Sequence, residues 1–93
     1  MRFEWDARKA ESNLKKHGIS FDEAVTVFYD PLAATFADLE HSDEENRFLT
    51  IGHSGQGRLL VICHVDRLST LRLISARRAT SGERRRHEGE QRS

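Results

Sequence analysis

The sequence predicts an α+β domain in which a small antiparallel β-sheet is combined with two N-terminal helices and one C-terminal helix. Three observations support this class. Apolar residues follow helical spacing in the first third, strand-like patterns begin near residue 32, and a new helix-start signal follows residue 79. Hairpin-length loops between the last three strands favour antiparallel pairing. With 93 residues there is room for one modest core, so we expect a single domain over residues 1–93.

The first third is predicted to contain one strand and two helices. Arg2–Trp5 has the alternation of a short strand, and Asp6 is placed to cap a helix that ends at Gly18. Ser20–Glu23 has the pattern of a capping box, and Asp30-Pro31 should end the second helix. The apolar positions of the two helices are Ala7, Ala10 and Leu14, followed by Phe21, Ala24, Val25 and Phe28.

The remaining residues are predicted to form strands and a last helix. We expect strands at Leu32–Leu39, Arg47–His53, Arg58–Val65 and Leu68–Ala76, with a polar turn at His41–Asn46, a hairpin loop at Ser54–Gly57 and a turn at Asp66–Arg67. The continuous apolar run in Arg58–Val65 indicates a strand covered on both faces. Thr80–Glu83 is a second capping box. The helix after it has no aliphatic or aromatic residue, so both a solvated tail and a basic arm held by phosphate or a partner fit its composition.

Composition argues against a membrane or secreted protein. The longest apolar run, Leu59–Cys63, is far shorter than the roughly 20 residues needed to cross a bilayer, and the N-terminus lacks the apolar core of a signal peptide. We therefore expect a cytoplasmic protein with no membrane partner. Cys63 is the only cysteine and lies within the apolar run, which indicates a buried, inert thiol.

The net charge of zero hides a separation of charge along the chain. Residues 1–46 carry five Lys and Arg against eleven Asp and Glu, whereas residues 47–93 carry ten Arg, no Lys and four acidic residues. Arginine binds phosphate bidentately through its planar fork, so the pattern indicates a nucleic-acid face. Mutual neutralisation of the two halves explains the total charge nearly as well, but it explains the clustering less well.

Arginines gather where the last strand is predicted to pass into the last helix. A helix N-terminus adds backbone donors and a positive dipole end, which makes this junction an anion site. Arg77 and Arg78 directly precede the helix start, and strand alternation predicts that Arg77 shares the face of Leu73 and Ser75 while Arg78 points the other way. The cluster comprises Arg72, Arg77, Arg78, Arg84, Arg85 and Arg86.

RNA cleavage requires a base at the ribose 2′-OH, an acid at the leaving 5′-oxygen and cations on the phosphorane. The candidate proton carriers are His17, His64, His87 and Glu83, with Lys16 as a further cation. A structural role is the more common one for a histidine within a strand such as His64. His17 could equally complement the C-terminus of its helix.

Metal and nucleotide-cofactor sites are not expected. His41, His53 and His64 lack the paired spacing of zinc ligands, and the acidic run Asp43-Glu44-Glu45 lacks the pattern of a calcium loop. The glycines around residues 52–57 are not followed by the Lys-Ser/Thr pair of a phosphate-binding loop. We expect neither a metal nor another cofactor.

Several motifs together resemble the BrnT family of bacterial toxins over nearly the whole chain. They are Phe3-Glu4-Trp5-Asp6, Lys9, Asn13, Lys16-His17-Gly18-Ile19-Ser20-Phe21, Glu23-Ala24, Arg47, Ile51-Gly52, Arg58-Leu59-Leu60-Val61, Arg72-Leu73-Ile74-Ser75-Ala76-Arg77-Arg78-Ala79-Thr80 and Glu83-Arg84. The resemblance implies a metal-independent ribonuclease with a RelE-like fold. It also implies neutralisation by a BrnA-type antitoxin whose DNA-binding half represses the shared operon. Family members usually carry an aromatic hydroxyl at the position of His87, so a tyrosine-dependent role does not transfer.

The hypothesis that best fits these observations is an RNA endonuclease toxin held in a hetero-oligomer by its antitoxin. Arg77 and Arg78 would stabilise the phosphorane, and His17, His64 or Glu83 would move protons. The residues assigned to RNA binding are Lys16, Arg58, Arg72, Arg84, Arg85 and Arg86. Two alternatives remain open: a non-catalytic RNA-binding or regulatory module, and a structural subunit whose arginines bind an acidic protein segment.

Overall fold

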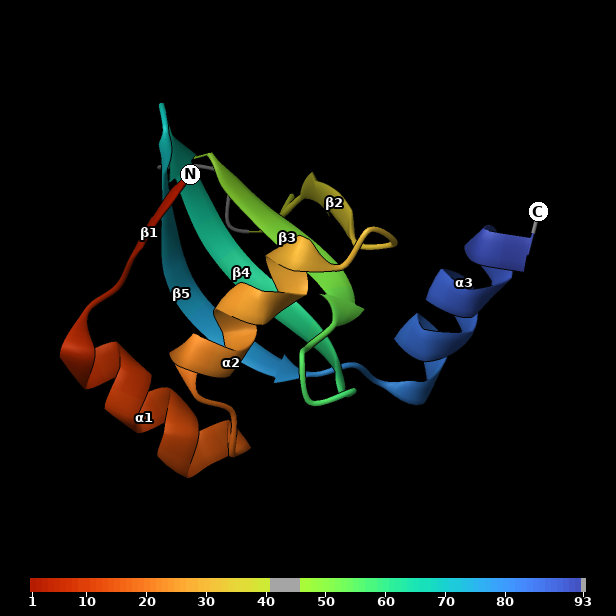
Figure 1. Cartoon of the computed structure of the whole chain (residues 1–93), viewed down its shortest axis with the longest axis horizontal. Helices are drawn as coiled ribbons and strands as arrows, with labels where there is room; N and C mark the ends of the chain where they lie inside the picture. Colours follow the sequence, from red (N-terminus) through yellow and green to blue (C-terminus); the bar gives the residue numbers. More distant parts are fainter. Residues whose placement is uncertain (41–45, 93) are drawn as a thin grey trace.

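The computed structural model describes residues 1–40 and 46–92, so the predicted turn at His41–Asn46 lies, apart from Asn46, outside the described residues. The elements are β1 (Arg2–Glu4), α1 (Ala7–His17), α2 (Phe21–Thr26), the 3-10 helix η1 (Val27–Tyr29), β2 (Ala34–Ala37), β3 (Arg47–His53), β4 (Leu59–Arg67), β5 (Thr70–Arg78) and α3 (Ser81–Arg92) (Figure 1). The predicted α+β class is confirmed.

Within the described chain, the strands form a five-stranded sheet in the order β1-β5-β4-β3-β2. The pairs β2–β3, β3–β4 and β4–β5 are antiparallel, but β1 runs parallel to β5. The prediction of a purely antiparallel sheet is therefore wrong, because loop lengths constrain only consecutive strands and β1 pairs with the last strand. The helix arrangement also differs: η1 continues α2, and α3 lies apart from α1 and α2 (Figure 1).

The predicted turn at Asp66–Arg67 is wrong. Both residues remain in β4, where Asp66 pairs with Leu71 and Arg67 with Thr70. The chain reverses at Leu68, which has a φ of 52°. A two-residue hairpin loop requires positive φ at a central position, so Leu68 takes a conformation that sequence statistics assign to Gly or Asn.

The starts of the first two helices and the end of α1 follow their predicted signals, whereas α2 ends at Thr26, before the predicted stop at Asp30-Pro31. Asp6 Oδ1 accepts a hydrogen bond from the backbone N–H of Arg8 at 2.7 Å. Gly18 ends α1 in the left-handed conformation, with a φ of 70°. Ser20 Oγ accepts a hydrogen bond from the backbone N–H of Glu23 at 3.0 Å and so begins α2.

The buried face of α1 differs from the predicted apolar face. Leu14 is 51% exposed, whereas the polar neighbour Asn13 is buried. The Asn13 amide donates to the carbonyls of Ile19 and Ala76, at 2.9 Å each, and its Oδ1 accepts from the Ala76 N–H at 3.0 Å. Strand β1 pairs with β5 only at residues 70–72. Further along β5, the backbone of Ala76 bonds to the side chain of Asn13 instead.

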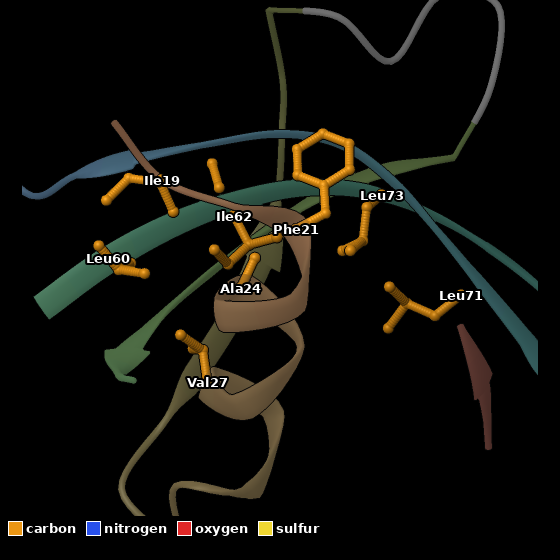
Figure 2. Close-up of a cluster of buried hydrophobic side chains, with 9 residues drawn as sticks. Ile19, Phe21, Ala24, Val27, Leu60, Ile62, Leu71 and Leu73 are labelled. Carbon is orange, nitrogen blue, oxygen red and sulfur yellow. The ribbon is translucent and has the colours of Figure 1, made fainter. Parts of the chain in front are cut away.

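Two apolar clusters lie on opposite faces of the sheet. In the larger one, Ile19, Phe21, Ala24 and Val27 pack against Leu60, Ile62, Leu71, Leu73 and Ala76 (Figure 2). The smaller one contains Ile51, Leu59 and Val61. Alternate residues of β4 therefore point to opposite faces and are buried on both, which confirms that prediction. We call the two sides the α2 face and the α3 face, because α3 residues line a pocket over the second.

Candidate active site

A bulge in β5 decides which arginine faces which side of the sheet. His64 pairs with Leu73 and Cys63 pairs with Ser75, so Ile74 is an extra residue in β5. Beyond it Arg77 pairs with Val61 on the α3 face, and Arg78 pairs with Leu60 on the α2 face. The prediction that Arg77 shares the face of Leu73 is therefore wrong, because one inserted residue reverses the alternation.

Arg77 is held at the start of α3 by Glu83. Its Nη1 and Nη2 donate to Glu83 Oε1 and Oε2 at 2.8 and 2.9 Å. Glu83 Oε1 also accepts from the Thr80 N–H at 2.8 Å, and Thr80 Oγ1 accepts from the Glu83 N–H at 3.1 Å, which confirms the second capping box. The hydrogen bonds from Arg77 are the largest influence and lower the pKa of Glu83 to about 2. Glu83 is thus ionised at neutral pH and is suited to holding Arg77 rather than to moving protons.

A pocket of about 400 Å³ lies between α3 and the sheet. The side formed by the sheet is apolar. The side formed by α3 carries the carboxylate of Glu83, the guanidinium of Arg86 and the imidazole of His87. The lining residues are Phe36, Leu49, Ile51, Val61, Glu83, Arg86 and His87. Apolar and aromatic surface of this kind can stack a base while a guanidinium contacts phosphate. We call this the α3 pocket.

Two histidines lie together beside the α3 pocket. His87, on α3, is buried at 3% exposure, and its ring centroid is 6.3 Å from that of His53 at the end of β3. The Nδ1 of His53 lies 3.7 Å from Oδ2 of Asp30. No local spacing links His53 to residue 30 or residue 87, so the sequence pointed to it only as one of three histidines without the spacing of metal ligands. Only the fold brings these three side chains together.

The candidate proton carrier His64 lies on the α2 face and is only 1% exposed. Its Nδ1 is 2.6 Å from Asp66 Oδ1, and its Nε2 is 2.7 Å from Thr50 Oγ1. Burial lowers the pKa of His64, even though Asp66 acts in the opposite direction. The ring also contacts Phe28 and Phe48. His64 is therefore a satisfied core histidine, enclosed away from the α3 pocket.

Lys16 and His17 belong to a different surface. They line a groove of about 240 Å³ between α1 and β5, together with Lys9, Ser12, Asn13, Ile74 and Ser75. Two lysines and an imidazole make this groove basic. Figure 1 shows α1 and α3 at opposite sides of the molecule, so the structure does not bring His17 to the α3 pocket.

The other candidate arginines differ in how firmly they are engaged. Arg58 forms an ion pair with Glu23, in which Nε donates to Oε2 at 2.9 Å and Nη2 contacts Oε1. This hydrogen bonding lowers the pKa of the buried Glu23. Ser54 Oγ also donates to Glu23 Oε2, at 2.7 Å. Arg58 thus fastens the β3–β4 loop to α2.

The remaining arginines lie at the surface. Arg72 is 3.4 Å from Glu4, and Arg84 is 3.6 Å from Glu88 one turn along α3. Arg85 and Arg86 are exposed on the same helix, and Arg86 also lines the α3 pocket. Ion pairs of this length and exposure are weak and can be exchanged for phosphate contacts. The arginine cluster therefore extends along α3 from the junction with β5. The prediction that Arg72 belongs to it is wrong, because Arg72 lies near the start of β5, beside Glu4 of β1.

The described residues bear on two expectations, one for a metal site and one for the single cysteine. Among residues 1–40 and 46–92, no three His, Cys, Asp or Glu side chains are grouped so that they could hold a metal ion. Cys63 is partly buried, and burial raises its pKa, as expected for an inert thiol. No helix in the described part of the chain is both long and apolar enough to cross a membrane.

The fold and this pocket define a small α+β protein with an arginine-bearing helix beside an apolar, histidine-containing cleft. The chain belongs to the BrnT family, described as the ribonuclease toxin of a type II toxin-antitoxin system, whose pattern matches residues 5–83. Its structure is similar to that of the Brucella abortus ribonuclease toxin BrnT, with a TM-score of 0.69 and 25% sequence identity. That match covers 87% of this chain and 99% of the other. No curated protein matches the chain in sequence.

Proposed function

We propose that this protein is a ribonuclease toxin that cuts RNA endonucleolytically and so inhibits translation, with its active site in the α3 pocket. The observation that carries the proposal is the arrangement, in a BrnT-family chain, of Arg86 and His87 against apolar sheet residues with Arg77 fixed beside them. Phe36 and Leu49 provide surface on which a base can stack. The arginines supply the positive charge that the phosphorane requires.

The proposed roles follow from the side of the sheet on which each residue lies. Arg77 and Arg86 contact the scissile phosphate, and His87 exchanges a proton with the reacting oxygens. Glu83 holds Arg77 in position. The residues proposed to hold the RNA backbone away from the cut are Lys16, His17, Arg72, Arg78, Arg84 and Arg85. His64 and Arg58 support the fold through their partners Asp66 and Glu23.

The proposed reaction does not use a metal. Support comes from the chemistry of the pocket, where guanidinium groups can neutralise charge and imidazole can transfer protons. Activity should therefore be unchanged by EDTA. Loss of cleavage in EDTA that magnesium or zinc restores would overturn this part of the proposal.

A cognate antitoxin is the proposed partner. Membership of a toxin-antitoxin family supports an antitoxin, and the resemblance of the sequence motifs supports a BrnA-type, DNA-binding one. We propose that the two proteins form a hetero-oligomer in the cytoplasm and that residues 1–93 act as one ribonuclease domain. The arginine surface would be covered in that complex.

The deciding experiment is single-turnover cleavage of a defined RNA by refolded, partner-free protein in EDTA. We expect cleavage that is abolished by a 2′-deoxy substitution at the cut site, because the attacking group is the 2′-OH. A matched DNA strand should bind without being cut. If the RNA binds with a steep salt dependence but is never cleaved, the protein is a non-catalytic RNA-binding module instead.

A further inference from the structure

His53 lies on the same side of the sheet as the α3 pocket. It pairs with Leu59 in the β3–β4 ladder, and Leu59 belongs to the apolar cluster of the α3 face. Its side chain is 42% exposed, so the imidazole can be reached from solvent. His53 is the last residue of β3, and Ser54 directly after it is fixed by Glu23. A side chain on such a supported strand end has a defined position.

Asp30 contacts both the backbone and the imidazole of His53. Its Oδ1 accepts from the Leu32 N–H at 2.9 Å and its Oδ2 from the His53 N–H at 2.8 Å, which leaves Oδ2 3.7 Å from the imidazole Nδ1. Burial acts to raise the pKa of Asp30, but these hydrogen bonds and the nearby histidines lower it overall, so the carboxylate is ionised. Gly52 makes the approach possible, since a Cβ there would lie 3.2 Å from Asp30 Oδ2 and 2.9 Å from Ala33 Cβ.

His87 faces His53 from α3. The helix start is fixed by the Thr80–Glu83 capping box and by Arg77, and His87 lies one turn beyond Glu83. The two ring centroids are 6.3 Å apart, so the imidazoles are close neighbours. The charged groups around the pair are Asp30 from the loop after η1, and Glu83 and Arg86 from α3.

We propose that His53, oriented by Asp30, is a second catalytic residue that works with His87 in the cleavage of RNA; this rests on the function proposed above. One neutral imidazole removes the proton of the 2′-OH as the O2′–P bond forms. The other, protonated, gives its proton to O5′ as the P–O5′ bond breaks. The products are a 2′,3′-cyclic phosphate and a 5′-hydroxyl, and no water, metal or oxidant is consumed. Two positioned imidazoles can supply both proton transfers at near-neutral pH.

The test compares four proteins in the single-turnover assay in EDTA, between about pH 5 and pH 9. We expect a bell-shaped rate profile for the wild type and a loss of about 10²-fold or more, with one limb missing, for His53→Asn and for His87→Asn. Gln56→Ala, an exposed change in the same hairpin loop, is the matched control and should keep the wild-type profile. RNA affinity and melting temperature should change little in His53→Asn.

Asp30→Asn and imidazole rescue separate catalysis from structure. Asp30→Asn should slow cleavage less, by about 10-fold, while both limbs remain, because the carboxylate orients the ring without touching RNA. Added imidazole should restore part of the rate of folded His53→Ala. A folded His53→Ala that imidazole does not rescue would assign His53 a structural role and overturn the inference.

The assay also separates this inference from the proposed function. If the wild type cleaves RNA and His53→Asn cleaves at the same rate with the same pH profile, only the role of His53 is overturned. If the wild type binds RNA but never cleaves it, the proposed function fails and the role of His53 fails with it. Cleavage products with a 2′,3′-cyclic end, lost in both histidine variants, support both.

Discussion

Asn13 and Leu14 are neighbours whose burial is the reverse of what their residue types suggest. Asn13 is buried and bonds three backbone groups, whereas Leu14 is half exposed. Removing the amide leaves buried backbone groups of Ile19 and Ala76 without their partner, and each such group costs about 1–3 kcal/mol.

We expect Asn13→Ala to lower the free energy of unfolding by about 2–3 kcal/mol. Urea denaturation with an unchanged slope would measure this. Leu14→Ala, one position along, is the matched control and should change stability by no more than about 0.5 kcal/mol. An Asn13 variant as stable as the Leu14 variant would show that the backbone of β5 finds other partners.

Arg77 and Arg78 provide a second comparison at the scale of single residues, because the bulge at Ile74 sends them to opposite faces. Arg77→Ala should lower the single-turnover rate of RNA cleavage by about 10²-fold with little change in RNA affinity. Arg78→Ala should mainly weaken binding and flatten the salt dependence by roughly one unit. The reverse pattern, in folded variants, would place the active site on the α2 face.

Among the elements, α3 is the one that has no apolar face of its own to hold it against the sheet. It has no aliphatic or aromatic residue, yet its start is fixed by the Thr80–Glu83 capping box and by Arg77, and His87 is buried. The sequence left open whether this segment is a solvated tail or a basic arm held by phosphate or a partner. In the structure the described residues form a helix whose first turns are attached to the rest of the fold. Its attachment is therefore electrostatic and should depend on pH.

The pH dependence of this attachment should come from Glu83. Its pKa is about 2 in the folded protein against about 4.5 in an unfolded chain. A carboxyl group with a depressed pKa contributes stability that is complete above about pH 5 and is lost as pH falls towards 2. We expect Glu83→Gln to be less stable than the wild type at neutral pH and to lose less stability on acidification. Melting temperatures measured across that range would check this, and parallel curves for the two proteins would contradict it.

Across the whole molecule, the separation of charge has two consequences. Some opposite charges pair within the chain, as in the partly buried pair Arg58–Glu23 and the surface pair Arg72–Glu4. The arginines of α3 instead extend along the surface beside the α3 pocket. Mutual neutralisation therefore accounts for Arg58 and Arg72, whereas a nucleic-acid face remains a prediction for the arginines of α3.

A toxin made by its own host must be silenced, so we expect the antitoxin to cover α3 and the α3 pocket. Hydrogen exchange of the complex should show protection at Phe36, Leu49 and the start of α3, relative to the free protein. Added RNA should compete with the antitoxin for α3 and the α3 pocket, and for no other surface. Protection confined to residues 1–46, with Arg77 and Arg86 still open to solvent, would contradict this steric model of inhibition.

The sequence by itself determined the helix caps, the strand β3 and the two-sided burial of β4. These depend on residues within a few positions of one another, as in Asp6 with Arg8 or Thr80 with Glu83. Only the tertiary structure decided the parallel pairing of β1 with β5, the face of Arg77 and the meeting of His53 with His87. Each of these depends on contacts between distant segments or on one inserted residue. A one-residue shift in register moves every later side chain of a strand to the other face, and local patterns do not record it.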